Sequence, residues 1–256
     1  MPHTRFAVFL ILLVAVNVFA GWLTGGPDGA AVWVLAAWLV TILLLFGCFV
    51  IVGRLPPIVD WRGVIIDQRN RLSLSRLQLV MWSLLVISAV LTEGLVNTVW
   101  GACNPLDLSV PSELWILLGL ASGSAVAAPV VLGIKGDQGV LSTRPPNRYA
   151  WRDIFYGDEV GNDDQVDFSK VQQFFLTVAV VLVYGIEIGR ILLHPKICPT
   201  SCAGAAAATA GSACGAPAIL HFPPLSEGIL AIVAVSQVAY IAYKAVPHTK
   251  SDRPSG

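Results

Sequence analysis

Charged residues are scarce in this sequence. Of its 256 residues only 12% are charged, whereas 55% are hydrophobic, and the mean hydropathy is +0.73. A soluble globular protein of this length carries more polar residues to cover its surface. The shortage of charge excludes that class and predicts an integral membrane protein that has the lipid bilayer as a partner.

Motifs for catalysis and cofactor binding are missing as well. There is no nucleophile–base pair, zinc-binding helix, phosphate-binding loop or dinucleotide motif, and the four histidines lie at the termini or at span ends. A zinc site built from His194, His221 and nearby cysteines is conceivable, but no CxxC pair supports it. We expect no enzyme activity, no cofactor, no metal and no nucleic-acid partner.

Long apolar stretches are what the sequence has instead. Crossing about 30 Å of hydrocarbon takes about 20 helical residues, and six stretches reach or approach that length. They predict an all-α membrane protein with six transmembrane helices. The last stretch is the weakest, because polar residues such as Gln237 interrupt it. The six stretches are Phe6–Leu23, Ala30–Gly53, Leu77–Trp100, Leu114–Ile134, Val171–Leu193 and Gly228–Val246.

Basic residues are unequally divided between the two sides that these spans define. If both termini are cytoplasmic, only Arg190 and Lys196 lie on the outer side. Basic residues concentrate in the cytoplasmic loops of membrane proteins. The sequence therefore predicts a multi-pass membrane protein with both termini in the cytoplasm.

The cysteines agree with this orientation. Cys48 lies within a span and suits apolar packing, whereas the other four fall in outer loops. An even number of cysteines on the oxidising side suggests two disulfides, for which three connectivities exist. The candidates are Cys103, Cys198, Cys202 and Cys214.

One stretch of the chain recurs. Ser75–Glu93 aligns with Ser169–Glu187 at a spacing of 94 residues, which also places Arg76 on Lys170. We predict two parallel repeated helical hairpins and an additional N-terminal hairpin. The predicted parts are 1–53 (N-terminal hairpin), 54–74 (cytoplasmic juxtamembrane segment), 75–135 (first repeat hairpin), 136–168 (cytoplasmic loop), 169–247 (second repeat hairpin) and 248–256 (cytoplasmic tail).

The helix starts in both copies match the capping box. In this motif a serine oxygen accepts a hydrogen bond from the backbone N–H three residues on, and a glutamine side chain reaches back. Such a structural role accounts for these residues without catalysis. The predicted caps are Ser75 with Gln78, Ser169 with Gln172, and Ser112 and Ser226 as N-caps of the helices that follow.

Two carboxylates lie deep in the repeated apolar stretches. Glu93 and Glu187 each follow the capping glutamine by 15 residues, or about 22 Å along a helix, which places them in the outer leaflet. Glu113 and Glu227 begin the next helices at the outer surface. Together the four residues predict an acidic outer vestibule that concentrates cations.

A structural interpretation of the same carboxylates is local. Arg190 lies three residues after Glu187, and Asn97 lies four residues after Glu93. Residues at these spacings are neighbours on a helix surface. An ion pair or a hydrogen bond with these partners would explain both carboxylates equally well.

The predicted cytoplasmic loop mixes aromatic and charged residues. Its segment 149–156 suits a short amphipathic helix in the membrane interface, and an acidic run without EF-hand spacing follows. The loop predicts a docking surface for a cytoplasmic or membrane protein, with a solvated connector as the alternative. The docking candidates are Trp151, Arg152, Phe155, Tyr156, Asp158 and Glu159.

Four short segments resemble the landmarks of a bacterial family of multi-pass membrane proteins. They are Arg71–Gln78 (RLSLSRLQ), Pro111–Trp115 (PSELW), Trp151–Glu159 (WRDIFYGDE) and Lys244–His248 (KAVPH), and the likeness runs between residues 60 and 250. The resemblance implies a six-span protein of the bacterial inner membrane and no particular activity. The chain departs from the family at 234–236, where Ala-Val-Ser stands in place of Gly-Ile-Ser.

These features lead to two functional hypotheses. The first is a small cation channel or transporter with the acidic outer vestibule, assembled as a homo-oligomer. The motif Gly119-x-x-x-Gly123 would provide close helix packing within or between protomers. The alternative is a non-catalytic membrane scaffold or accessory subunit that docks a partner through residues 136–168.

Overall fold

The structure is a computed structural model. It describes residues 2–24, 31–56, 58–100, 108, 110–137, 139, 150–160, 162–194 and 222–248. All four cysteines predicted to form disulfides, at 103, 198, 202 and 214, lie outside these residues. Cys48 lies within them and is a buried free thiol.

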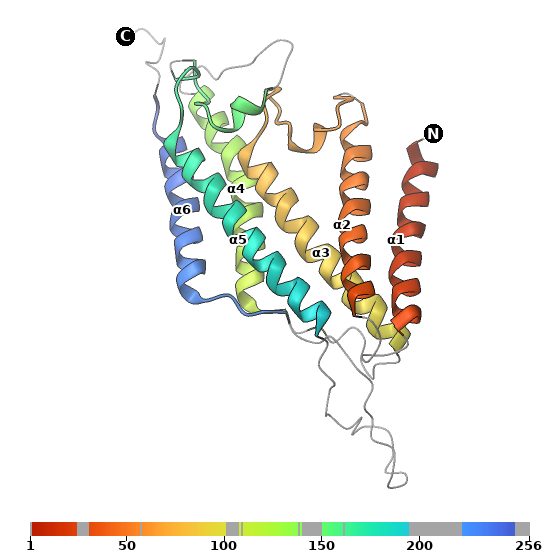
Figure 1. The fold of residues 1–256 in the computed structure, drawn as a ribbon. Helices are drawn as coiled ribbons and strands as arrows, with labels where there is room; N and C mark the ends of the chain where they lie inside the picture. Colours follow the sequence, from red (N-terminus) through yellow and green to blue (C-terminus); the bar gives the residue numbers. More distant parts are fainter. Residues whose placement is uncertain are drawn as a thin grey trace, which may run out of the picture. The chain divides into compact units, whose positions relative to one another are not determined.

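Six long helices make up the described part of the chain (Figure 1). Each contains a window long and apolar enough to cross a membrane, which confirms the prediction of six such helices. No strand longer than an isolated bridge occurs among the described residues. The helices are α1 (Pro2–Thr24), α2 (Val32–Gly53), α3 (Leu74–Trp100), α4 (Ser112–Asp137), α5 (Phe168–Leu193) and α6 (Glu227–Ala245).

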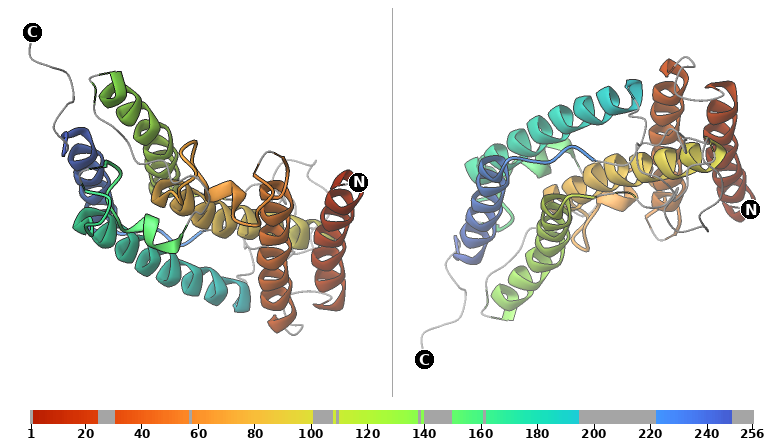
Figure 2. Two further views of the ribbon diagram at one scale, coloured as in Figure 1. Left: turned by 90° about the horizontal axis from the view of Figure 1, so that it is seen from above. Right: turned by 90° about the horizontal axis from the view of Figure 1, so that it is seen from below.

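The chain divides into two compact units. Helix α1 and nearly all of α2 belong to unit 1, whereas α4 and α6 belong to unit 2; α3 and α5 contribute to both. Within unit 2, α4 packs against α6 (Figure 2). Unit 1 comprises Met1–Ile51, Leu84–Pro111 and Val183–Pro223, and unit 2 comprises Val52–Ser83, Ser112–Leu182 and Pro224–Gly256.

Unit 1 is tied together by neutral hydrogen bonds between helices. A polar side chain in a lipid-embedded helix needs a partner on a neighbouring helix, because lipid offers none. Three such bonds join α1 to α2, α2 to α3, and α3 to α1. They run from Asn17 Nδ2 to Thr41 Oγ1 (2.8 Å), from Trp38 Nε1 to Ser88 Oγ (2.9 Å) and from Trp100 Nε1 to Thr24 Oγ1 (2.8 Å).

In unit 2, the segments that lead into α3 and α5 fold alike. Each begins with a short 3-10 helix, η1 (Gly63–Ile65) or η2 (Trp151–Ile154). Each then forms an antiparallel bridge, between Ile66 and Leu72 or between Tyr156 and Val166, two residues before the membrane helix starts. Helices α3 and α5 thus start at residues 74 and 168, 94 positions apart.

A small apolar core is formed by residues of these two segments, of the start of α3 and of α6. It joins both of them to the end of α6, so that the loops of unit 2 are packed parts of the fold. Its buried members are Ile65, Ile66, Leu72, Leu74, Ile154 and Tyr240.

Candidate functional site

Four basic side chains surround the carboxylate of Asp158, which lies between the bridged residues of the second segment. They come from the turn before α3, from the first turn of α5 and from the last turn of α6. The nearest nitrogen–oxygen distances are 2.9 Å for Arg69, 3.9 Å for Arg71, 3.0 Å for Lys170 and 2.8 Å for Lys244. We call these five residues the Asp158 cluster.

The cluster holds Asp158 in its charged form. Burial alone would raise the pKa of this carboxyl, because water no longer solvates the charge. The positive charges of Lys244, Lys170 and Arg69 outweigh burial and hold the pKa of Asp158 well below its usual range. Asp158 is therefore an anion at neutral pH, and it neutralises basic groups from three separate parts of unit 2.

Glu159 makes a second buried connection. Its Oε1 accepts a hydrogen bond from Lys135 Nζ at 2.5 Å, and its Oε2 accepts one from the backbone N–H of His248 at 2.7 Å. Lys135 Nζ also donates to the carbonyl of Val246 at 2.5 Å. This acid therefore ties the end of α4 to the chain that leaves α6.

Gly157 allows the loop to bring both acids inward. A Cβ atom at this position would lie 2.2 Å from the backbone oxygen of Asn162, which no side chain tolerates. The carbonyl of Gly157 in turn accepts a hydrogen bond from Arg71 Nη1 at 2.6 Å. The close approach of the Asn162 backbone to Gly157 thus requires a glycine at this position of the WRDIFYGDE segment.

The predicted docking surface is smaller than the sequence suggests. Trp151 and Arg152 are exposed, whereas Phe155 and Tyr156 are partly buried. The two acids that follow them, Asp158 and Glu159, pair with basic groups of this same chain, and docking of a partner through this segment stays a prediction.

A line of polar side chains leads from the Asp158 cluster into the helices of unit 2. Lys244 Nζ donates to the hydroxyl of Tyr240 at 3.2 Å, and Ser75 Oγ donates to the same hydroxyl at 3.2 Å. All three residues are buried. They connect the end of α6 with the first turn of α3.

Farther along the same helices lies a group that we call the glutamine cluster, made of Gln78, Gln173, Thr177 and Gln237. Gln78 Nε2 donates to Thr177 Oγ1 at 2.7 Å, and Gln237 Nε2 donates to Gln78 Oε1 at 3.2 Å. Gln173 is fully buried, yet neither polar atom of its side chain has a hydrogen-bond partner among the described residues, nor has Gln237 Oε1. Buried polar atoms are nearly always paired, so three unpaired atoms in one place require an explanation.

Side chains of the predicted capping boxes form other hydrogen bonds in the structure. Helix α3 starts at Leu74, and the side chains of Ser75 and Gln78 bond to Tyr240 and Thr177 instead of to their own first turn. Both residues therefore belong to the polar line of unit 2.

Asp167 caps α5 in place of Ser169. Its Oδ1 accepts hydrogen bonds from the backbone N–H groups of Ser169 (3.0 Å) and Lys170 (3.4 Å). Gln172, the other half of the predicted box, is exposed. Ser226 does cap α6, as predicted, because its Oγ accepts from the backbone N–H of Ile229 at 3.3 Å.

The two carboxylates predicted to be equivalent lie in unlike surroundings within unit 1. Glu93 is 1% exposed, and its Oε2 has no hydrogen-bond partner among the described residues. Glu187 has a side chain that is 41% exposed and pairs with Arg190 at 2.9 Å, as the local interpretation predicts. Asn97 is buried.

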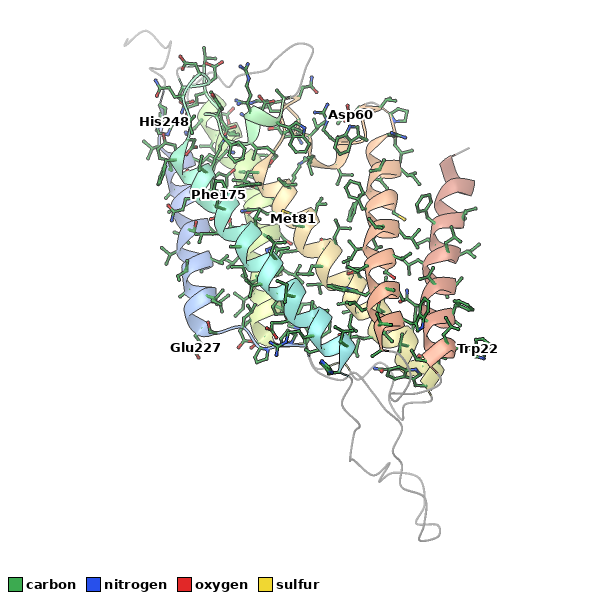
Figure 3. All side chains as sticks on the ribbon, viewed as in Figure 1. Trp22, Asp60, Met81, Phe175, Glu227 and His248 are labelled. Carbon is green, nitrogen blue, oxygen red and sulfur yellow. The ribbon has the colours of Figure 1, made fainter. Side chains whose placement is uncertain are left out.

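The other two vestibule residues belong to unit 2. Glu113 and Glu227 lie in the first turns of α4 and α6, where the sequence places them. Figure 3 labels Glu227 at the start of α6 and His248 beyond its other end. A vestibule made of all four carboxylates stays a prediction.

The glutamine cluster is not evident from the sequence alone. A signal was present in the last apolar stretch, where Gln237, Tyr240 and Lys244 follow one another at spacings of three and four residues and so share one helix face. Gln173 carried a weaker signal, since it stands next to Gln172 near the start of its span. Only the fold reveals that α3, α5 and α6 bring these residues together.

Comparison with models of protein families, with curated proteins and with solved structures found no match for this chain.

Proposed function

We propose that this protein is a small membrane transporter with both termini in the cytoplasm, and that unit 2 binds and moves a small polar solute. The observation that carries the proposal is Gln173, a fully buried glutamine whose two polar atoms have no partner among the described residues. A buried polar atom left unpaired costs about 1–3 kcal/mol. Water or a solute passing through the site would supply the missing partners.

The polar line gives this site a connection to one end of unit 2. Gln237, Tyr240 and Lys244 span eight residues of α6, and the seven steps between the first and the last amount to about 10 Å along the helix. All three are buried. A hydrated solute can therefore exchange hydrogen bonds from the Asp158 cluster to the glutamine cluster without crossing an apolar gap on this helix.

Internal duplication also favours a transporter, because many transporter folds are built from repeated units. The predicted equivalence of Arg76 and Lys170 is matched by equivalent contacts. Arg76 Nη1 donates to the carbonyl of Ile66, and Lys170 Nζ donates to the carbonyl of Tyr156, both at 2.5 Å. Each acceptor is the first bridged residue of its segment, which supports two repeats related by 94 residues.

The charges of unit 2 favour a neutral or anionic solute over a cation. Cation selectivity was predicted from carboxylates at the outer side, but Glu187 is paired with Arg190. At the end of the polar line basic groups outnumber acids, since four surround the single carboxylate of Asp158. A homo-oligomer and membership of the bacterial family stay predictions.

Solute flux into liposomes that contain the purified protein tests this proposal. The panel comprises the anions chloride, phosphate and acetate and the neutral solutes glycerol and urea, with sodium, potassium and protons for comparison. Flux of at least one of them should exceed that of empty liposomes, and Gln173→Leu should lower it about tenfold, because one lost hydrogen bond is worth about 1.4 kcal/mol. Gln172→Leu is the matched control, since its neighbouring glutamine is exposed. Equal loss in both variants, or no flux in the wild type, would contradict the proposal.

The scaffold alternative has one observation in its favour. Trp61 and Trp151 are 42% and 49% exposed, their rings lie 6.1 Å apart, and the guanidinium of Arg62 lies 5.6 Å and 5.9 Å from the two ring centres. Tryptophan and arginine dominate the energetics of protein interfaces. A Trp151→Ala variant that loses a stoichiometric partner, together with absence of flux in the wild type, would favour a scaffold.

A further inference from the structure

We propose that unit 2 contains a binding site for a phosphate-type oxyanion, supplied either by a lipid headgroup or by free phosphate. The site is a cavity of about 130 Å³ beside the Asp158 cluster, which is several times the space of one water molecule. Three basic side chains line it: Arg69, Arg76 and Lys244. The proposal does not depend on transport.

Arg76 is the residue best placed to hold an anion. Its Nη1 donates to the carbonyl of Ile66 at 2.5 Å, and no carboxylate in the described part of the chain forms a salt bridge with it. The remaining N–H groups of its guanidinium are thus available. Arginine presents these donors in a planar fork that matches two oxygens of a phosphate.

The surrounding charges are unbalanced in favour of an anion. Asp158 and Asp67 are the carboxylates that pair with the basic groups here, and the basic groups outnumber them. The excess positive charge raises the local concentration of anions and lowers the free energy of one bound in the cavity. The basic residues are Arg69, Arg71, Arg76, Lys170 and Lys244.

Asp67 also lines the cavity, but its oxygens are already engaged. Oδ1 accepts from the backbone N–H groups of Arg69 (2.8 Å) and Arg71 (3.0 Å), and Oδ2 accepts from Arg69 Nε (2.9 Å). The lining also includes Ser73 and Gln68, whose side chains are neutral hydrogen-bond donors. Asp67 therefore stabilises the turn and engages Arg69, whose other nitrogens bond to Asp158, and it leaves the donors of Arg76 to face a ligand.

The opposite wall comes from α4 and is made of small or apolar residues, among them Ala125, Ala128 and Gly133. These residues lie 4 to 12 positions before the end of α4 at Asp137, or about 6–18 Å along the helix. If α4 spans the bilayer, the cavity reaches from headgroup depth into the hydrocarbon. A lipid phosphate and a free phosphate both have access to such a position.

Binding to the purified full-length protein tests this proposal with two probes. Inorganic phosphate is titrated by calorimetry in a neutral detergent. Retention of phosphatidylglycerol is measured by native mass spectrometry after reconstitution in mixed phosphatidylglycerol and phosphatidylcholine. Arg76→Gln should weaken binding about tenfold, the loss expected for one charge-assisted bidentate contact. Arg54→Gln is the matched control, because it removes an exposed basic residue of the same connecting segment.

A second pair of variants guards against a folding defect. Gly133→Leu adds a side chain to the wall of the cavity, whereas Gly136→Leu adds one outside the lining. Both variants should fold, because a Cβ atom at either position meets no atom within 4 Å. Gly133→Leu alone should reduce binding. Saturable phosphate binding identifies a free oxyanion as the ligand, and retention of phosphatidylglycerol without a phosphate response identifies a headgroup. Absence of both in the wild type, or equal losses in variant and control, would overturn the proposal.

Discussion

Unit 1 and unit 2 both bury polar side chains, but they satisfy them by different means. In unit 1 the bonds between helices are neutral, as from Asn17 to Thr41 and from Trp38 to Ser88. In unit 2 charged side chains from helix ends and loops converge on Asp158 and Glu159. Neutral bonds cost little to place in lipid, whereas buried charges persist only when each has a partner. Unit 2 thus depends on pairing between charged groups that are far apart in the sequence, whereas the hydrogen bonds between the helices of unit 1 are neutral.

The contrast is sharpest between two carboxylates of low exposure: the side chain of Asp158 is 11% exposed, and Glu93 is 1% exposed. Asp158 is surrounded by four basic groups, whereas Glu93 in unit 1 forms no salt bridge among the described residues and has an unpaired oxygen. Removing the carboxyl group of Asp158 should therefore harm the protein, and removing that of Glu93 should not.

Asp158→Asn should have the largest effect. The substitution leaves four basic groups around a neutral amide, and breaking a buried ion pair costs about 3–5 kcal/mol. We expect the free energy of unfolding in detergent, followed by tryptophan fluorescence, to fall by that amount. Asp163→Asn, an exposed acid of the same loop, should change it by less than about 0.5 kcal/mol. A similar loss in both variants would contradict the comparison.

Acidification should remove the contribution of Asp158. The unfolded carboxyl has a pKa of about 3.9, and the cations hold the folded pKa of Asp158 well below that. The folded state therefore binds fewer protons, and the stability that this group contributes is present above pH 4 or so and is lost as the pH falls through the folded pKa. The stability difference between wild type and Asp158→Asn should shrink below that pH. A constant difference would show that Asp158 acts by packing alone.

Lys135 and Glu159 should show strong coupling in a double-mutant cycle. The single variants Lys135→Met and Glu159→Gln each leave a buried group without its charged partner, whereas the double variant removes both. We expect a coupling free energy of about 1–3 kcal/mol, measured from the unfolding of all four proteins. A coupling near zero would mean that the backbone N–H of His248, which also donates to Glu159, satisfies this acid alone.

The vestibule carboxylates should show the smallest effects. Glu187→Gln removes an exposed pair with Arg190, which is worth about 0–1 kcal/mol. Glu93→Gln keeps the shape of the side chain and replaces a buried carboxyl that lacks a basic partner among the described residues with a neutral amide, so stability should stay equal or rise. Thermal unfolding of both variants provides the measurement. A loss of more than about 1 kcal/mol in stability for Glu93→Gln would contradict this expectation, because it would indicate that Glu93 has a basic partner.

Hydropathy predicts the six helices because it depends only on local sequence, and their starts lie within a few residues of those expected. The surroundings of Asp158 depend instead on residues far along the chain, such as Arg69, which lies 89 positions earlier. A loop acid with distant partners is indistinguishable in sequence from a solvated one. Glu93 and Glu187 fail the predicted equivalence for a related reason, since aligned positions on two helices need not meet the same neighbours.

The most direct test of the transport proposal measures whether water reaches Gln173. The five native cysteines are first replaced, and one cysteine is then introduced by Gln173→Cys, Phe175→Cys or Asp163→Cys. Each variant is treated in membranes with a water-soluble thiol reagent. Phe175 is 63% exposed on the surface of α5 (Figure 3) and, facing lipid, should not react; Asp163, in the loop, should react fully. The proposal predicts that Gln173→Cys reacts nearly as fast as Asp163→Cys. Protection of Gln173→Cys to the level of Phe175→Cys would contradict a water-filled path through unit 2.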